Sequence, residues 1–278
     1  MLVSAIIPCF NAQSTVARAI ESVLKQSVSV DEIIVINDGS TDNSLEVITQ
    51  LHKDYEQIIV IDQKNQGVCV ARNNGIKKAL GIYILTLDSD DFFEPTFVEK
   101  ALKKFEEDNN YGAVMCGYVR VVHGKKIMPY IPNEISFKSC LLNNGALACL
   151  LFKKAALIEA GLYDASMKDG YEDWDLNIRV LKNGYQYGIV REVLFNYVDS
   201  EQSRNDVATE KNIKLRMQLF HKYREDYELH QEYFFKEFIK ENNRLVKENK
   251  RIKNSTSFKW SHAIITNVEK IKNIFKSN

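Results

Sequence analysis

The first half of this chain alternates short apolar runs with stretches of helical periodicity, and this alternation restricts the possible folds more than any other feature. The apolar runs lie at residues 2–7, 32–37, 58–61 and 83–87. Such near-continuous apolar runs are typical of strands buried on both faces of a parallel sheet. Between them, apolar residues recur at helical spacing over residues 16–24, 44–51 and 68–80. The pattern predicts an open α/β sheet with right-handed crossovers, flanked by helices.

The pattern becomes mixed from residue 111 and helical after residue 202. We expect a hairpin over 113–122 and 125–128, a short strand over 148–152, a helix over 172–182, and one or two strands over 186–197. Residues 205–250 contain no glycine or proline and are rich in Lys, Glu, Leu and aromatic residues, which predicts long helices. We interpret the Tyr and Phe residues between 220 and 238 as helix-packing core. Two domains are therefore expected, residues 1–203 and a C-terminal helical extension at 204–278.

Composition excludes several classes of protein. The chain is 45% hydrophobic and 27% charged, which is typical of a globular protein and not of a disordered one. Its five cysteines show no CxxC pair and no zinc spacing, so we interpret them as buried thiols in a reducing compartment. The apolar start lacks a basic leader, and no apolar run approaches the roughly 18 residues that span a bilayer, so we expect a cytoplasmic protein.

The C-terminal end is strongly basic, with nine basic and two acidic residues over 244–278. Apolar residues recur there at helical spacing with lysines between them, at Ile264, Val268, Ile271 and Phe275. Such a basic amphipathic helix can lie peripherally at the inner face of the cell membrane, pack on the first domain, or pair with another subunit in a homo-oligomer. We expect no nucleic-acid partner.

Asp88, Asp90 and Asp91 follow an apolar strand directly. Carboxylates so close repel one another unless a positive group compensates them, and Mg²⁺ or Mn²⁺ prefers such oxygen ligands. The alternative is an acidic turn that caps a helix beginning at Glu94 and Pro95. The strongly apolar strand before the turn favours the metal site, because ligands bind at the carboxyl ends of strands in open α/β sheets.

A second acidic cluster consists of Glu172, Asp173 and Asp175, with Trp174 between them, at the start of a predicted helix. The helix dipole stabilises carboxylates at this end, so the cluster can be a simple N-terminal cap. A carboxylate beside a bound hydroxyl can instead serve as a general base. The residues alone leave both interpretations open.

Two further segments follow predicted strands. Asp38 precedes a glycine, and the segment can be an Asx turn or part of a ligand site. Arg72 lies in the first turns of the third predicted helix, after Asn65, Gln66 and Gly67. A helix N-terminus with an arginine suits a phosphate, although a capped surface helix would look the same. The usual dinucleotide and P-loop glycine fingerprints are absent.

Five segments, taken in order, resemble the motif set of the family 2 inverting glycosyltransferases, which have the Rossmann-like, nucleotide-sugar-binding GT-A fold. The segments are Ile7–Asn11, Asn37–Asp42, Asn65–Gly67 with Ala71–Asn73, Asp88–Asp91 and Glu172–Asp175. Each motif alone is weak evidence for the family, but five motifs in this order are specific evidence. The resemblance covers residues 2 to about 203. The resemblance implies a mixed sheet flanked by helices, with a helical extension after it.

The resemblance also implies a role for each matching position. Asp173 would be the catalytic base, with Glu172 and Trp174 in the acceptor site. Asp90 and Asp91 would bind the divalent cation, Mn²⁺ or Mg²⁺. The donor nucleotide sugar would be held by Pro8, Asn11, Asp38, Arg72, Asp88, Ser89, Asn144 and Gly145.

The chain departs from the family pattern at one place. Val198, Ser200 and Ser203 stand where many members have Arg, His and Ser, and that histidine can bind the metal. Asp199 or Glu201, or the diphosphate and water, could complete the metal shell instead.

We therefore expect a metal-dependent inverting hexosyl- or N-acetylhexosaminyltransferase. It would move a sugar from a UDP-linked donor to a glycan or lipid-linked glycan acceptor in surface polysaccharide biosynthesis. One alternative is a catalytically silent sugar-nucleotide-binding scaffold, but such a module has little reason to keep clustered carboxylates. Another is a sugar nucleotidyltransferase, which should carry a basic, glycine-rich loop after the first strand. Residues 8–13 contain neither a glycine nor a basic residue.

Overall fold

The computed structural model describes residues 2–199 and 212–260. The chain divides into two compact units, residues 1–222 and 223–278. The expected domain boundary after residue 203 lies outside the described residues and stays a prediction. The same holds for the basic amphipathic segment, of which residues 261–278 are not described.

The first unit is built on one mixed sheet, which has nine strands within the described residues. The strands are β1 Val3–Cys9, β2 Glu32–Asp38, β3 Ile58–Gln63, β4 Tyr83–Thr86, β5 Phe92–Phe93, β6 Tyr111–Val122, β7 Lys125–Tyr130, β8 Leu151–Lys153 and β9 Gln186–Val198. Their order is β3-β2-β1-β4-β8-β6-β9-β5, and β7 extends from β6. The first four strands pair in parallel, whereas β8 is antiparallel to both β4 and β6.

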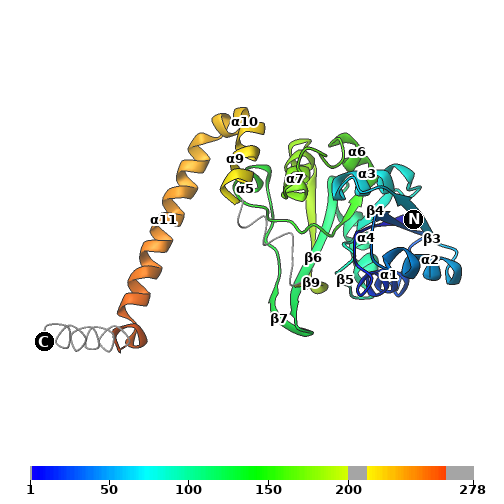
Figure 1. The fold of residues 1–278 in the computed structure, drawn as a ribbon. Coiled ribbons are helices and arrows are strands. Elements are labelled where there is room, and N and C mark those ends of the chain that lie inside the picture. The colour runs from blue at the N-terminus through cyan, green and yellow to red at the C-terminus, as the bar shows by residue number, and fades with distance from the viewer. Residues whose placement is uncertain (1, 200–211, 261–278) are drawn as a thin grey trace, which may run out of the picture. The chain divides into compact units, whose positions relative to one another are not determined.

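Helices cover both faces of this sheet (Figure 1). On one face lie α3 Val68–Lys78, α6 Lys154–Glu159 and α7 Glu172–Lys182. On the other lie α1 Val16–Leu24, α2 Ser44–Asp54 and α4 Phe97–Glu107. The short α5 Phe137–Leu142 packs against α7, and α9 Asn212–Lys222 completes the unit.

The second unit consists of helices within its described residues, α10 Arg224–Leu229 and α11 Gln231–Asn254. The long helices expected from the composition are therefore confirmed. The expected packing of the aromatic residues is confirmed in part. Tyr223 is 5% exposed and the rings of Tyr227 and Phe234 lie 5.0 Å apart, whereas Phe235 and Phe238 are 63% and 68% exposed. Among the described residues, we find no helix that combines the length and the apolar character needed to cross a membrane.

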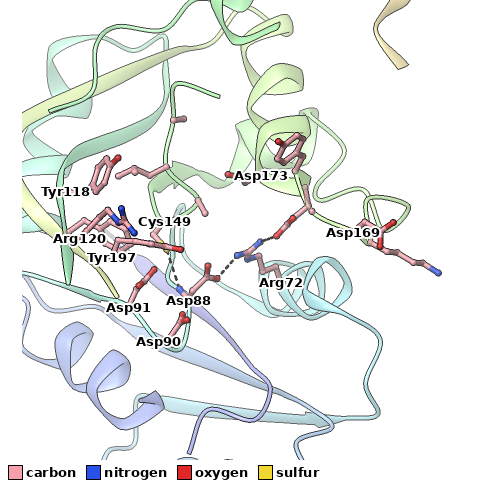
Figure 2. Close-up of a pocket in the computed structure, with 18 residues that line it drawn as sticks. Arg72, Asp88, Asp90, Asp91, Tyr118, Arg120, Cys149, Asp169, Asp173 and Tyr197 are labelled. Atoms are coloured by element: carbon pink, nitrogen blue, oxygen red, sulfur yellow. Dashed lines mark hydrogen bonds and ion pairs between the residues drawn. The ribbon is translucent and has the colours of Figure 1, made fainter. Parts of the chain in front are cut away.

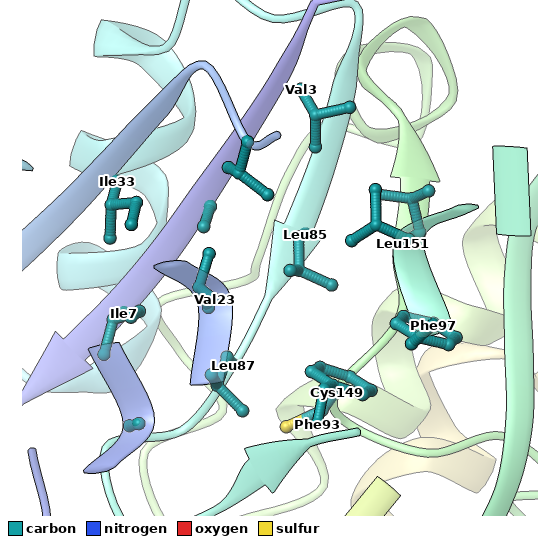
Figure 3. Packing of buried hydrophobic residues seen from close by; sticks show 14 of the residues in the cluster. Val3, Ile7, Val23, Ile33, Leu85, Leu87, Phe93, Phe97, Cys149 and Leu151 are labelled. Carbon is teal, nitrogen blue, oxygen red and sulfur yellow. The ribbon is translucent and has the colours of Figure 1, made fainter. Parts of the chain in front are cut away.

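The alternating first half of the chain folds as the sequence predicts. Strands β1 and β2 are buried along their whole length, which agrees with their near-continuous apolar runs. Figure 3 shows side chains from β1, β2, β4, β8 and α1 meeting in one core, among them Val3, Ile7, Val23, Leu85 and Leu151. Because β1, β2 and β4 run parallel, their carboxyl ends meet at one edge of the sheet.

The chain differs from expectation between β4 and α4. The helix expected at Glu94 begins at Phe97 because Phe92 and Phe93 pair with β9 as the short strand β5. The backbone N–H of Glu94 then donates to Leu194, which continues this pairing. The strands expected over 186–197 are one long strand, β9.

Helix α3 packs on the sheet unusually closely at Gly75. A Cβ atom at this position would lie 2.8 Å from both Ile36 Cδ1 and Ile6 Cγ2. Glycine normally weakens a helix interior, so its presence here reflects this close contact between helix and sheet.

We predict that Gly75→Ala lowers the free energy of unfolding, although alanine favours a helix by about 1 kcal/mol. The overlap with Ile6 and Ile36 costs about 1–3 kcal/mol and exceeds that gain. Ile36→Val alone should cost about 0.5–1.5 kcal/mol. Because it removes the overlapping Cδ1, the double variant should lose less than the sum of the two single losses. Urea unfolding of the four proteins measures this coupling, and additive losses would contradict the close contact.

Candidate functional site

A pocket of about 430 Å³ opens at the carboxyl edge of the sheet. Figure 2 shows Tyr118, Arg120 and Tyr197 on one side and Arg72, Asp169 and Asp173 on the other, with Asp88, Asp90 and Asp91 between them. The pocket thus joins the two acidic clusters that the sequence singled out. They come from segments more than 80 residues apart, β4 and α7.

Strand pairing explains how the first acidic cluster is positioned. Leu85 of β4 pairs with Leu151 of β8 in antiparallel register, so the residues just after β4 lie opposite those just before β8. Cys149 is therefore adjacent to Asp88, whose backbone N–H lies 3.4 Å from the Cys149 sulfur. On the other side, the Asp91 carboxylate accepts a 2.8 Å hydrogen bond from the backbone N–H of Val198 at the end of β9.

Arg72 connects the two acidic clusters. Its side chain is 1% exposed, and its guanidinium donates to Asp88 through Nη2 and to Glu172 through Nη1, the latter over 3.1 Å. The ring of Tyr163 covers the guanidinium, with a centroid 5.0 Å from Cζ. Breaking a buried ion pair of this kind is costly because it leaves the partner charge uncompensated. Arg72 therefore holds the end of β4 and the start of α7 together.

The carboxylates of the first acidic cluster, Asp88, Asp90 and Asp91, repel one another, and the protein compensates their charge poorly. Asp91 is 3% exposed. Burial raises the pKa of its carboxyl, and the charges of Asp90 and Asp88 raise that pKa further. Ligand atoms of Asp88, Asp91 and Cys149 all lie within 4.8 Å of one another, so this group could hold a metal ion. A divalent cation here would offset the repulsion among the carboxylates.

The thiol of this group is a poor ligand in its protonated form. Burial raises the pKa of Cys149, and the negative charges of Asp88 and Asp91 raise it further. Metals bind the thiolate rather than the thiol. The carboxylate oxygens are therefore the groups in this cluster that fit a hard cation such as Mg²⁺ or Mn²⁺.

Asp173 lies at the other end of the pocket, in the first turn of α7. Its enclosure by the surrounding protein and then the charge of Glu172 raise its pKa to about 6. The amide of Asn144 donates a 2.8 Å hydrogen bond to Oδ2, which favours the charged form. A carboxylate with such a pKa can accept a proton near neutral pH and hold it more firmly than an ordinary aspartate can.

Helix α7 is held in place by a second buried charge, Asp175, which has no exposed side-chain surface. Arg179 and Lys222 bind its two oxygens over 2.7 and 2.6 Å. Lys222 belongs to α9, whose Arg216 also lies over the Trp174 ring at 4.9 Å. Helix α9 is thus part of the support for the pocket.

Several pocket residues could not be recognised from the sequence. Tyr118 and Arg120 project from β6, next to Phe195 and Tyr197 of β9 in register. A single arginine within the apolar run of β6 was the one available signal. Its guanidinium binds both carboxylate oxygens of Asp199, so Asp199, considered above as a metal ligand, is engaged in an ion pair. Glu201 lies outside the described residues.

Some predicted residues reach the pocket and others do not. Those in its lining are Arg72, Asp88, Asp90, Asp91, Glu172 and Asp173. Those outside it are Pro8, Asn11, Asp38, Ser89, Asn144, Gly145 and Trp174. Asn144 nevertheless contacts Asp173, as described above. Trp174 is 3% exposed and donates from Nε1 to the carbonyl of Cys140, so it supports the pocket wall from behind.

The residues expected to hold the nucleotide base lie at the same edge of the sheet, at the ends of β1 and β2. Asp38 is 3% exposed, and its carboxylate accepts hydrogen bonds from the backbone N–H groups of Gln66 and Gly67, each over 2.9 Å. The Asn11 side chain accepts from the backbone N–H of Thr41 over 2.8 Å. These contacts order the loops beside the pocket, and the nucleotide-binding roles stay predictions.

We predict that Arg72→Met destabilises the protein by about 3 kcal/mol, because it leaves the buried carboxylate of Glu172 and the half-buried carboxylate of Asp88 uncompensated. Adding Glu172→Gln should restore part of the lost stability, since it removes one of the two uncompensated negative charges. Thermal unfolding at neutral pH compares the three proteins. Glu172→Gln alone gives the loss of stability that this substitution causes when Arg72 is present. If it caused the same loss when added to Arg72→Met, Arg72 and Glu172 would not form the ion pair described.

Comparison with known proteins agrees with this architecture. Residues 4–157 match the model of Glycosyl transferase family 2. The chondroitin synthase of Pasteurella multocida (strain Pm70) is 41% identical over 113 residues, which are 41% of this chain and 12% of that protein. The poly-beta-1,6-N-acetyl-D-glucosamine synthase of Staphylococcus aureus (strain COL) is 30% identical over 194 residues, 65% of this chain and 47% of that protein. The chain thus spans less than half the length of both relatives.

A solved structure shares the fold. S. aureus TarS 1-349, crystallised in complex with UDP-GlcNAc, superposes with a TM-score of 0.63 at 19% sequence identity, over 74% of this chain and 61% of that one. This likeness confirms the expected fold, a GT-A-like mixed sheet flanked by helices. The family match covers more than half of the chain. The chain therefore belongs to glycosyl transferase family 2.

Proposed function

We propose that this protein transfers a sugar, with inversion, from a UDP-linked donor to a hydroxyl of a glycan or lipid-linked glycan. One observation carries the proposal: the pocket holds a carboxylate with a pKa near 6, Asp173, apart from a carboxylate cluster suited to a cation. Arg72 lies between them and binds both acidic segments. The site therefore has separate groups for accepting a proton and for compensating phosphate charge.

The choice of donor and of biological role is supported by the relatives. TarS was crystallised with UDP-GlcNAc, and the matched curated proteins are synthases of chondroitin and of poly-N-acetylglucosamine. We therefore propose a UDP-hexose or UDP-N-acetylhexosamine donor and a role in surface polysaccharide biosynthesis.

Carboxylates of Asp88, Asp90 and Asp91 would hold a Mn²⁺ or Mg²⁺ ion. Bound there, the ion would compensate negative charge on the diphosphate as the nucleotide leaves. Asp91 fits this role because it is buried beside two other acidic residues.

Asp173 would accept the proton of the acceptor hydroxyl. The acceptor oxygen would attack the anomeric carbon as the bond from that carbon to the diphosphate oxygen breaks. Attack from the face opposite the diphosphate inverts the anomeric centre, and one carboxylate base suffices for this single displacement. A double displacement would need a dedicated nucleophile as well.

The opposite wall of the pocket suits a sugar. Tyr118 and Tyr197 are pocket-lining aromatic residues, and Arg120 adds hydrogen-bond donors beside them. Aromatic side chains offer a large apolar surface with a polar end, which matches the mixed character of a sugar ring. We propose that acceptor contacts come from this wall and from Glu172, with Trp174 acting as support.

We predict that Asp173→Asn lowers kcat for transfer by about 10²- to 10⁴-fold, because the amide cannot accept the proton. Donor affinity should stay near that of the wild type. The test uses a panel of nucleotide sugars with Mn²⁺, with and without a chelator, and follows nucleotide release and donor binding separately. Asp169→Asn is the matched control, because Asp169 lines the same pocket from the loop before α7.

Each alternative gives a distinct result in this experiment. Binding of a sugar nucleotide without release of nucleotide in any variant would identify a silent scaffold. Formation of a sugar nucleotide from a nucleoside triphosphate and a sugar phosphate would identify a nucleotidyltransferase. Full transfer activity of Asp173→Asn would reject Asp173 as the base.

The pKa of Asp173 leads to a pH prediction. The carboxylate form is the base, so kcat/KM should fall on the acid side with an apparent pKa near 6. Asn144→Ala removes an N–H that stabilises the carboxylate, which raises the pKa and moves the acid limb to higher pH. The neighbouring exposed Asn143→Ala serves as control and should leave the limb in place. An acid limb unmoved in Asn144→Ala would contradict this contact.

A further inference from the structure

Helix α11 is long and largely exposed. It contains 24 residues, which corresponds to about 36 Å. Among the described residues, none in this helix is buried. Six of its large apolar side chains are exposed by 43% to 68%, namely Phe235, Phe238, Ile239, Leu245, Val246 and Ile252, whereas Phe234 is half-buried. A helix with so much exposed apolar surface normally has a partner that covers it.

Phe235, Phe238, Leu245 and Ile252 of α11 fall at the a and d positions of a heptad repeat, whereas Phe234, Ile239 and Val246 lie beside this seam at positions g and e. Steps of three and four residues connect Phe235, Phe238, position 242, Leu245, position 249 and Ile252. In a heptad labelled a to g, Phe235 and positions 242 and 249 take position a, whereas Phe238, Leu245 and Ile252 take position d. A seam of alternating three- and four-residue steps is the pattern of a coiled coil, and α11 carries about three heptads of it.

The remaining positions are those of a solvated outer face. The b, c and f positions are Lys236, Glu237, Lys240, Asn243, Arg244, Lys247, Lys250, Arg251 and Asn254. Ion pairs within the helix connect Lys240 with Glu237 over 2.6 Å, and Arg244 with the g residues Glu241 and Glu248 over 2.7 and 3.1 Å. These contacts support the helix along its polar side and leave the seam unoccupied by charge.

Asparagine occupies two of the three a positions, Asn242 and Asn249. The two asparagines distinguish between the kinds of partner that could cover the seam. An apolar occupant, such as the interior of a lipid layer, would leave both amides without hydrogen-bond partners, which is costly. In an antiparallel helix pair, position a faces position d, so each amide would face Phe or Leu. In a parallel, in-register pair, each asparagine meets its own copy, and one amide donates to the other.

The charges beside the seam fit the same arrangement. In a parallel pair, the g residue of one helix faces the e residue of the next heptad on the other helix. Glu248 at g would then face Lys253 at e, which is an attractive pair. The two pairs formed by symmetry are equivalent, as expected for a twofold axis along the coil.

We propose that α11 forms a parallel, two-stranded coiled coil with α11 of a second copy of this chain, with Asn242 and Asn249 setting its register. The proposal is independent of the proposed function, since no residue of the seam belongs to the pocket. The partner is an identical chain because the in-register meeting of like residues is what satisfies both asparagines.

Disulfide trapping tests orientation and register. The native cysteines of the chain are buried, so they give little background. Under mild oxidation, Asn249→Cys should form a covalent dimer on a non-reducing gel, because the two thiols meet at position a. Lys250→Cys, one residue away on the outer face, is the matched control and should stay monomeric on the gel. Equal crosslinking of both variants, or of neither, would overturn the parallel in-register pairing.

Light scattering of the full chain tests association itself. The wild type should have twice the 32.0 kDa mass of one chain. Leu245→Asp should be monomeric, since it places like charges in the seam, whereas Lys247→Asp on the outer face should remain dimeric. Circular dichroism checks that both variants fold. A monomeric wild type, a dimeric Leu245→Asp, or a monomeric chain that floats with anionic vesicles in a Leu245-dependent way would each overturn the proposal.

Discussion

The guanidinium of Arg72 is the constraint on which the arrangement of the pocket depends. It is nearly inaccessible to water and binds Asp88 after β4 and Glu172 at the start of α7. These residues come from distant parts of the sequence and would repel each other without it. Because a buried cation needs compensation as much as buried anions do, the three groups stabilise one another only in this arrangement. The positions of the loop at 88–91 and of the first turn of α7 follow from it.

The same arrangement gives the two acidic clusters different chemical properties. Asp173 is shielded from water and close to Glu172, so its carboxyl holds a proton near pH 6, while Asn144 keeps the charged form accessible. Asp91 is buried among its own acidic neighbours, and its position is fixed by the backbone of Val198. Under the proposed function, proton acceptance by Asp173 and charge compensation at Asp91 and its acidic neighbours would fall on groups that are separated in space.

The sequence predicted the parts of this site that follow from parallel strands. Near-continuous apolar runs identified β1 to β4, and the residues at or just after the ends of β2 and β4, Asp38 and Asp88, had to lie at one edge of the sheet. The position of Cys149 could not be predicted, because it depends on β8 entering the sheet antiparallel to β4, a long-range pairing with no local signal. Arg120 was missed for a similar reason, since its partner Asp199 is brought near by the pairing of β6 with β9. The burial of Trp174 depends on α5 and α9. A helical pattern predicts where such helices lie along the chain, but not what they pack against.

The anchoring of Asp175 by Lys222 has a consequence for where the unit that carries the pocket ends. The family match stops at residue 157 and the strands stop at Val198, yet Leu215 and Leu219 of α9 are as buried as the core of the sheet. Helix α9 therefore belongs to the folded body that carries the pocket, although its sequence resembles that of the helices after it. A fragment cut after the last strand would lose one of the two cations bound to a fully buried carboxylate in α7. The compact unit that carries the pocket therefore extends through residue 222, well beyond the last recognisable motif.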